Sequence, residues 1–209
     1  MSNKKDDIFS FNIITLGDSG VGKTSIIQRY VNNSFLEDTI ATIGFSYGFK
    51  DVTLKNNKIV KLKLVDTAGQ ERYRAINKSY YKNVNAVLFV FSLDKEGSLE
   101  KIKEWKKIFE ENKVGEDIPT YLIRNKCDLD EDDFDEELVE DLLKENNFLR
   151  FISVSAKNDI NINSLFEEIA ENWYNKIEKG PKNMNIRRLW SLEKNRKKKQ
   201  RCPICKGDM

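Results

Sequence analysis

Histidine is absent from this 209-residue sequence, and cysteine and proline occur only three times each. Without imidazole, the protein has no Ser-His-Asp or Cys-His catalytic arrangement, no histidine-ligated zinc and no acid–base catalysis by histidine. The three cysteines, Cys127, Cys202 and Cys205, do not form a disulfide framework. Any reaction must therefore rest mainly on positioning and electrostatics.

Long apolar runs are also missing. No segment approaches the roughly 18 apolar residues of a membrane-spanning helix, and no secretory signal is recognisable, so we expect a cytoplasmic protein. The charge is uneven: residues 179–209 carry 11 Lys and Arg and 2 Asp and Glu, a net charge of +9, whereas the rest of the chain sums to −7. We predict a globular domain over residues 1–178 and a flexible basic tail over residues 179–209.

A glycine-rich motif over residues 17–24 (Gly-Asp-Ser-Gly-Val-Gly-Lys-Thr) fits the pattern G-x-x-x-x-G-K-[ST]. An apolar run with strand character precedes it, and a helical pattern over residues 25–31 follows. In this context the backbone N–H groups of the loop surround a phosphate above a helix N-terminus. We predict that Lys23 reaches the β- and γ-phosphates and that the Thr24 hydroxyl holds Mg²⁺.

The rest of the domain alternates apolar strands with amphipathic helices. Strands are expected at residues 8–16, 45–54, 59–65, 86–91, 120–123 and 151–154, and helices at residues 22–32, around 99–109 and 138–143, and at 162–177. Asn56-Asn57 predicts a hairpin turn, and hence one antiparallel pair. The pattern predicts an α/β fold with a six-stranded, mostly parallel sheet flanked by about five helices.

A polar motif follows the third predicted strand, where ligands of parallel sheets bind. Asp66 is the residue type that holds Mg²⁺, usually through its water shell. Gly69 can bring a backbone N–H against a γ-phosphate, and Gln70 can orient an attacking water.

Two further motifs end the fifth and sixth strands, Asn125-Lys126-Cys127-Asp128 and Ser155-Ala156-Lys157. The Asp128 carboxylate can accept hydrogen bonds from N1–H and the 2-amino group of guanine, and adenine has neither donor. We expect the stems of Lys126 and Lys157 to lie along the base and the Ala156 N–H to donate to guanine O6. The predicted ligand is therefore GTP or GDP.

From about residue 8 to residue 177 the chain resembles the Ras superfamily of small GTPases, and within it the Rab family. The Rab-like segments are Thr42-Ile43-Gly44-Phe45, Lys-Leu-Lys-Leu at residues 61–64, Arg-Tyr-Arg-Ala-Ile at residues 72–76 and Tyr80-Tyr81. The resemblance implies a P-loop small-GTPase fold and a switch in vesicle traffic that hydrolyses GTP with Mg²⁺. Hydrolysis is expected to be slow without a GTPase-activating protein.

The resemblance also implies that Thr42 coordinates Mg²⁺ and binds the γ-phosphate, and that Phe35 packs against guanine. Gln70 is the expected catalytic residue, and Thr24, Thr42 and, through water, Asp66 are the expected metal ligands. The expected nucleotide-binding residues are Asp18, Ser19, Gly20, Val21, Gly22, Lys23, Thr24, Ser25, Phe35, Thr42, Gly69, Asn125, Lys126, Asp128, Ser155, Ala156 and Lys157. Expected partners are a guanine nucleotide exchange factor, a GTPase-activating protein and effectors that bind the switch regions.

Three positions depart from the Rab pattern. Val65 replaces a Trp of the usual partner-binding patch, Thr39 replaces a Tyr that commonly covers the nucleotide, and Arg124 replaces a Gly. These departures leave open a non-catalytic GTP-binding interaction module as an alternative.

The basic tail admits three interpretations: contact with an anionic membrane surface, a nuclear or nucleic-acid patch, or a solvated linker. The GTPase-like domain favours the membrane, on the cytosolic face of an endomembrane, and no nucleic acid is expected. A nuclear-transport-type GTPase is the other alternative. Cys202 and Cys205 are candidates for prenylation, with the prenylation machinery and a GDP-dissociation inhibitor as partners, although neither their spacing nor their distance from the end is typical. Two alternatives remain for these cysteines: they resemble half of a zinc site, and they could equally be unmodified.

Overall fold

The computed structural model describes residues 9–37, 42, 44–69, 81, 83–115, 117–129 and 136–179. The elements are β1 (Phe9–Leu16), α1 (Lys23–Asn32), β2 (Phe45–Thr53), β3 (Ile59–Thr67), β4 (Ala86–Phe91), α2 (Ile102–Asn112), β5 (Thr120–Arg124), α3 (Glu136–Glu145), β6 (Arg150–Ser153) and α4 (Ile162–Lys179). The chain divides into two compact units, Met1–Trp173 and Tyr174–Met209. The predicted boundary after residue 178 and the flexible tail stay predictions, because residues 180–209 lie outside the described residues.

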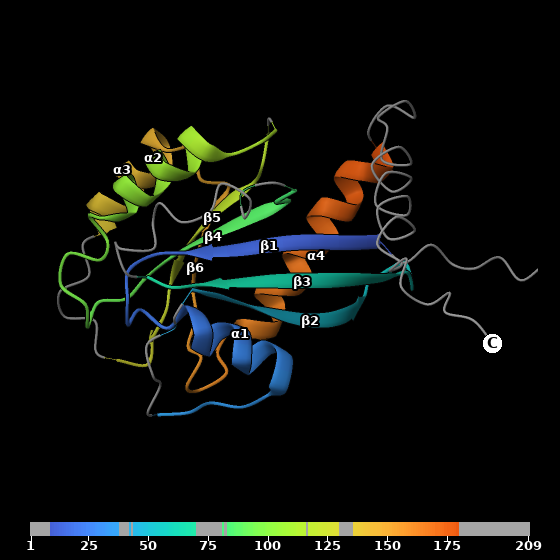
Figure 1. The fold of residues 1–209 in the computed structure, drawn as a ribbon, viewed down its shortest axis with the longest axis horizontal. Helices are drawn as coiled ribbons and strands as arrows, with labels where there is room; N and C mark the ends of the chain where they lie inside the picture. The colour runs from blue at the N-terminus through green and yellow to red at the C-terminus, as the bar shows by residue number, and fades with distance from the viewer. Residues whose placement is uncertain are drawn as a thin grey trace, which may run out of the picture. The chain divides into compact units, whose positions relative to one another are not determined.

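The six strands form one sheet in the order β2-β3-β1-β4-β5-β6 (Figure 1). The β2–β3 pair is antiparallel and every other pair is parallel. This confirms the predicted α/β fold, and the described part of the chain has four helices, close to the predicted five. No helix among the described residues is both long enough and apolar enough to cross a membrane.

The β2–β3 hairpin turns where the asparagine pair predicts it. Asn57 has a φ of 61°, and its N–H donates to the carbonyl oxygen of Leu54 over 2.9 Å. Asparagine tolerates this left-handed backbone better than most residues, because its short polar side chain can bond locally. The turn sets a register that pairs Phe45 with Thr67 and Thr53 with Ile59.

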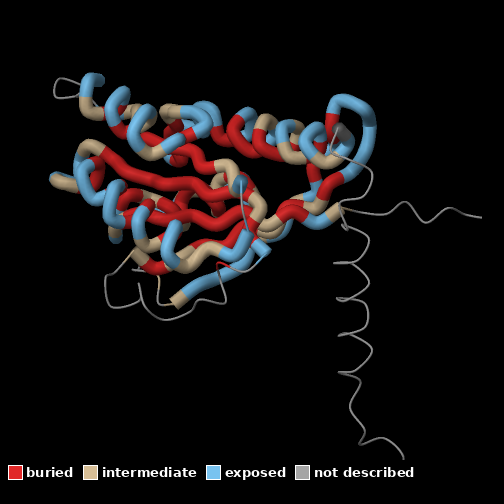
Figure 2. The backbone as a smooth tube through the Cα atoms, turned by 90° about the horizontal axis from the view of Figure 1, so that it is seen from above, coloured by how far each residue is buried: buried red, intermediate tan, exposed pale blue. Residues whose placement is uncertain are grey.

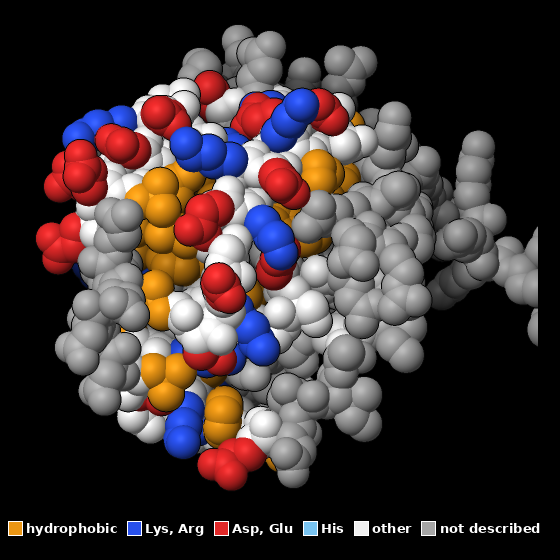
Figure 3. Space-filling model, turned by 90° about the vertical axis from the view of Figure 1, so that its left-hand side faces the viewer, with side chains coloured by type: hydrophobic (Ala, Val, Ile, Leu, Met, Phe, Trp, Pro, Cys, Tyr) orange, Lys and Arg blue, Asp and Glu red, His pale blue; other side chains and the backbone are white. Residues whose placement is uncertain are grey.

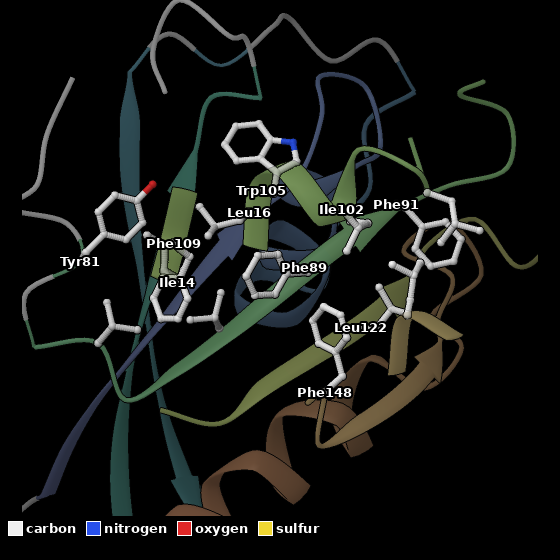
Figure 4. Packing of buried hydrophobic residues seen from close by; sticks show 14 of the residues in the cluster. Ile14, Leu16, Tyr81, Phe89, Phe91, Ile102, Trp105, Phe109, Leu122 and Phe148 are labelled. Atoms are coloured by element: carbon white, nitrogen blue, oxygen red, sulfur yellow. The ribbon is translucent and has the colours of Figure 1, made fainter. Parts of the chain in front are cut away.

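Side chains of the strands alternate between two apolar layers. On one face, Ile14 and Leu16 of β1 pack with Phe89 of β4 and with Trp105 and Phe109 of α2 (Figure 4). The cluster also takes in Val139 and Leu142 of α3, and the rings of Phe89 and Phe109 meet edge to face with centroids 6.0 Å apart. Figure 2 shows burial concentrated in the strands, while the helices alternate between buried and exposed residues.

The opposite face of the sheet is covered by α1 and by α4 as far as Trp173. Phe11 of β1 contacts Trp173 with ring centroids 4.6 Å apart, and Tyr30 of α1 stacks on Phe166 of α4 at 4.1 Å. β4 is buried along its whole length, as expected for a strand covered on both faces. Because β1, β3, β5 and β6 run parallel, their carboxyl ends lie at one edge of the sheet, where all four predicted motifs begin.

Candidate functional site

The loop between β1 and α1 is shaped by glycines that nothing larger can replace. Gly22 has a φ of +90°, and a Cβ there would lie 2.2 Å from Nδ2 of Asn125. Within the described residues, no side chain caps α1, and its first turn carries no acidic residue. Its first N–H groups are therefore left for another acceptor, at the positive end of the helix dipole.

Lys23 opens α1 with its ammonium folded back into this loop. The side chain is buried, and Nζ donates to the carbonyl oxygens of Gly17 over 2.8 Å and Asp18 over 2.7 Å. Burial lowers the pKa of Lys23 to about 8, against the opposing charges of Asp66 and Asp18. A desolvated cation at a helix N-terminus suits an anionic group such as phosphate.

Three oxygens converge beside Lys23 from separate elements. The Thr24 hydroxyl lies 2.7 Å from Oδ2 of Asp66 and 2.8 Å from the Thr42 hydroxyl. Asp66 is 1% exposed, and its Oδ1 is buried with no hydrogen-bond partner among the described residues. Burial raises the pKa of Asp66, although the hydrogen bond from Thr24 and the charge of Lys23 oppose the shift.

This set of oxygens fits Mg²⁺. Two hydroxyls and a carboxylate are hard donors, and the unpaired Asp66 oxygen can accept from a water of the metal's shell. Thr24, Thr42 and Asp66, the three residues predicted from sequence as metal ligands, are therefore brought together.

Gly69 lies directly against the phosphate loop. A Cβ at this position would stand 2.3 Å from the carbonyl carbon of Asp18 and 2.4 Å from the backbone N of Ser19. Only a residue without a side chain lets the two backbones approach so closely. Gln70, which follows, and Thr39 lie outside the described residues, so their predicted roles stay predictions.

The predicted base-binding motifs meet through Asn125, which is 2% exposed. Its Nδ2 donates to the carbonyl oxygen of Val21 over 2.9 Å, and its Oδ1 accepts from the backbone N–H of Ala156 over 3.2 Å. The sequence predicts that this N–H donates to guanine O6. In the structure it is directed at Asn125. The Asp128 carboxylate accepts a hydrogen bond from the Ser155 hydroxyl, so the two predicted base-binding loops are joined.

Lys126 spans the site from the base-binding side to the phosphate loop. Its Nζ donates to the carbonyl oxygen of Gly20 over 2.9 Å and to Oδ2 of Asp94 over 2.6 Å. Burial favours the neutral form of Asp94, but hydrogen bonds from Lys126 and Ser92 outweigh it and the pKa is lowered. Asp94 is a site residue that the sequence motifs do not reveal.

The other predicted residues lie around this frame. Ser25 is buried and Phe35 is half-buried, whereas Ser19 and Lys157 are exposed. The ammonium of Lys157 lies 3.9 Å from an exposed carboxylate oxygen of Glu37, a weak ion pair.

Helix α2 and Lys101, the residue that precedes it, also contact the loop between β1 and α1, and no sequence motif predicts these contacts. Oδ1 of Asp18 accepts from the indole Nε1 of Trp105 over 2.9 Å, and Oδ2 accepts from Nζ of Lys101 over 2.8 Å. Trp105 is 2% exposed and belongs to the apolar cluster of α2 and α3. Its N–H donor is the additional finding, because the apolar helical pattern gives no signal for a polar contact.

Two departures from the Rab pattern are buried structural residues. Val65 is 5% exposed and belongs to the apolar cluster of α2 and α3. Arg124 ends β5 at 6% exposure, paired in the sheet with Phe91 and Ser153.

Figure 3 looks onto the edge to which β1 and β3 point in Figure 1, where Lys, Arg, Asp and Glu side chains surround exposed apolar ones.

Comparison with known proteins finds similarity over nearly the whole of this architecture. Residues 12–175 match the Ras family. The chain is 35% identical over 175 residues to the Ypt/Rab-type GTPase YPT7 of Saccharomyces cerevisiae, covering 81% of this chain and 83% of that protein. It is 36% identical over 168 residues to Ras-related protein Rab-32B of Dictyostelium discoideum, covering 77% and 65%. It is 35% identical over 171 residues to Ras-related protein Rab-10 of Diplobatis ommata, covering 82% and 84%.

Proposed function

The chain belongs to the Ras family and is a Rab-like small GTPase involved in membrane traffic, and we propose how its residues bind GTP and hydrolyse it to GDP and phosphate. The observation that carries the proposal is the convergence of the Thr24 hydroxyl with Oδ2 of Asp66 and the Thr42 hydroxyl, beside the buried ammonium of Lys23. Cation, hydroxyls and carboxylate together suit a triphosphate with its metal.

Thr24, Thr42 and, through water, Asp66 hold Mg²⁺ in this proposal. When bound there, the metal would supply positive charge beside the phosphates. Lys23 exchanges its two backbone carbonyl partners for phosphate oxygens and adds a second positive charge there. Loss of the γ-phosphate would remove the proposed phosphate contact of Thr42, which precedes β2, whereas Asp66 stays within strand β3.

Gly69 directs its backbone N–H to the γ-phosphate, and Gln70 orients the attacking water. The close approach of Gly69 to the phosphate loop supports the first role, since the backbones meet without an intervening side chain. The nucleophile is water, the bond that breaks joins the γ-phosphorus to the bridging oxygen, and GDP leaves. We expect an intrinsic rate on the order of 10⁻⁴ to 10⁻² s⁻¹, rising about 10³- to 10⁵-fold when a partner supplies an arginine.

Single-turnover hydrolysis of bound GTP tests the role of Gln70. Gln70→Leu is expected to be slower than the wild type by about tenfold or more, because it no longer orients water. Gln28→Ala, on α1, is the control and is expected to hydrolyse at the wild-type rate. Equal rates for wild type and Gln70→Leu would contradict the assigned role.

Asp128 selects guanine in this proposal, with Asn125, Lys126 and residues 155–157 shaping the base pocket. The hydrogen bond from Ser155 holds the Asp128 carboxylate in place, which supports its use as a fixed acceptor. Asp128→Asn is expected to lose GTP affinity by about 10³-fold and to gain affinity for a xanthine nucleotide, whose carbonyl accepts where guanine donates. Calorimetric titration with the guanine and the xanthine nucleotide measures this change of preference.

Exchange factors, activating proteins and effectors act on the segments around Thr42 and Gln70. The basic tail contacts the cytosolic face of an endomembrane, and Cys202 and Cys205 carry lipid anchors. Intact mass of the protein isolated from membranes, with fractionation of a variant lacking residues 194–209, tests both statements. An unmodified mass in the membrane fraction would contradict the lipid anchors. An unchanged distribution of the shortened variant would contradict the proposal that the tail contacts the membrane.

A further inference from the structure

The guanidinium of Arg29 joins helix α1 to the loop of residues 155–157. Its Nε donates to the carbonyl oxygen of Ala156 over 2.8 Å, and its Nη2 donates to the carbonyl oxygen of Lys157 over 3.0 Å. Two successive carbonyl groups therefore face one planar fork of donors, which is the geometry that arginine offers and lysine does not.

The peptide groups around Ala156 are held from both sides. The Ala156 N–H donates to Oδ1 of Asn125 over 3.2 Å, and the Ala156 carbonyl accepts from Arg29. Asn125 in turn donates to the carbonyl oxygen of Val21 in the phosphate loop. Since alanine has only a methyl side chain, these backbone bonds fix its position between the phosphate loop and α1.

The same guanidinium reaches the C-terminal end of α1. Its Nη1 lies 3.3 Å from the carbonyl oxygen of Asn33, the left-handed residue that ends the helix, and the Asn33 N–H donates to the Arg29 carbonyl over 3.0 Å. The helix begins at Lys23 and Thr24, which serve the phosphate end of the site. Arg29 therefore ties the base-binding loop to the helix that carries the phosphate-binding residues.

We propose that Arg29 is a positioning residue that sets how long guanine nucleotide stays bound. It does so by holding residues 155–157 in the position from which they contact the base. The inference rests on the proposed function, because it takes the loop of residues 155–157 as part of the guanine pocket. Arg29 acts on nucleotide retention and not on the hydrolytic step, since its contacts lie on the base side of α1 and away from Thr42 and Asp66.

Nucleotide release from the full-length protein tests the inference. Wild type, Arg29→Ala and Gln28→Ala are loaded with a fluorescent N-methylanthraniloyl derivative of GDP, and its release into excess GDP is followed. Among the described residues the Gln28 side chain makes no hydrogen bond to the loop, so this neighbour is the matched control. Arg29→Ala is expected to release nucleotide about tenfold faster, because two charge-assisted hydrogen bonds are lost. Gln28→Ala is expected to match the wild type.

Two further measurements separate positioning from a general loss of structure. The single-turnover rate of hydrolysis of pre-bound GTP by Arg29→Ala is expected to stay within about twofold of the wild-type rate. A disrupted fold would instead lower the hydrolysis rate and shorten nucleotide retention together. Arg29→Lys keeps the charge and the aliphatic stem but offers no fork, so it is expected to fall between wild type and Arg29→Ala. This variant decides the question if Arg29→Ala fails to fold.

The outcomes are distinct. Release from Arg29→Ala or Arg29→Lys at the wild-type rate would overturn the inference, as would a parallel loss of hydrolysis. A wild-type protein that fails to retain the GDP derivative would instead overturn the proposed function.

Discussion

The indole of Trp105 donates from the apolar core to a carboxylate of the phosphate loop, with 2.9 Å between its Nε1 and Oδ1 of Asp18. The other oxygen of the same carboxylate takes an ion pair from Lys101, one helical turn earlier, at 2.8 Å. Helix α2 thus fixes the loop from the side opposite to α1. Trp105, which belongs to the same apolar cluster as Phe109 and Leu16, therefore also restrains the loop that is proposed to bind phosphate.

Asp18→Ala is expected to lower the free energy of unfolding by about 1–3 kcal/mol, because it leaves the buried indole N–H of Trp105 without its acceptor. Asp18→Asn keeps an oxygen for the indole but loses the partly exposed pair with Lys101 and the charge attraction to Lys23, so its cost is expected to be smaller than that of Asp18→Ala. Urea unfolding of both variants measures the difference. Equal destabilisation would mean that the indole hydrogen bond contributes nothing.

Lys23→Met is expected to weaken GTP and GDP binding by about 10²-fold or more, since it removes charge-assisted hydrogen bonds to phosphate. Without nucleotide, its stability is expected to change by less than about 1 kcal/mol, because relief of a buried charge offsets the loss of two backbone contacts. Calorimetric titration and urea unfolding measure the two quantities. The exposed Lys103→Met is the control for charge alone.

Gly69→Ala is expected to cost about 1–3 kcal/mol of stability and to weaken GTP binding more than GDP binding. The new methyl would meet backbone atoms of Asp18 and Ser19, which cannot move aside without displacing the phosphate loop. Gly48→Ala is the control for crowding away from the phosphate loop, because a Cβ there would meet only side-chain atoms, of Val31 at 3.0 Å and Ile27 at 3.1 Å. If both variants bind GTP and GDP in the wild-type ratio, Gly69 has no role at the γ-phosphate.

Lys106 predicts a pH dependence of stability that is separate from the site. It is buried against the rings of Phe89, Phe109 and Phe148, and its Nζ donates to Oγ1 of Thr120 over 3.0 Å. Burial lowers its pKa from the ordinary value of 10.5. The unfolded chain therefore takes up this proton more readily, so this residue's destabilising contribution is present at low pH and disappears as the pH rises to 10.5.

Lys106→Met removes that contribution. Near pH 7 its free energy of unfolding is expected to lie within about 1 kcal/mol of the wild type, since an apolar side chain suits the aromatic surroundings. As the pH rises from 7 toward 10.5, the wild type is expected to gain stability relative to the variant. Urea unfolding across this range tests the sign, with the exposed Lys107→Met as control. A difference that is constant with pH would show that Lys106 does not titrate differently on folding.

The strands, and the motifs at their carboxyl ends, are predictable from sequence because burial of a strand requires a recognisable pattern of apolar residues. The apolar run at residues 86–91 becomes a strand buried at every position, and the asparagine pair becomes the β2–β3 turn. The convergence of Thr24 and Asp66 also follows, since parallel strands deliver their carboxyl ends to one edge.

The contacts that hold the site in place are not predictable in the same way. Arg29 lies 127 residues from Ala156 in the chain, and Trp105 lies 87 residues from Asp18. Neither pair belongs to a local motif, and a tryptophan on an apolar stripe has the same pattern whether or not its N–H has a partner. Such contacts depend on the packing of whole helices against the sheet, which periodicity does not specify.

The position of Lys23 changes what nucleotide binding involves. Its ammonium already has two oxygen partners inside the loop, so in the proposed function binding is an exchange of backbone oxygens for phosphate oxygens. The loop then needs little reorganisation to receive its ligand, because the cation holds it in shape beforehand. Selectivity follows from the exchange: only a ligand that carries a negative charge can outcompete two neutral carbonyl groups that are already in contact.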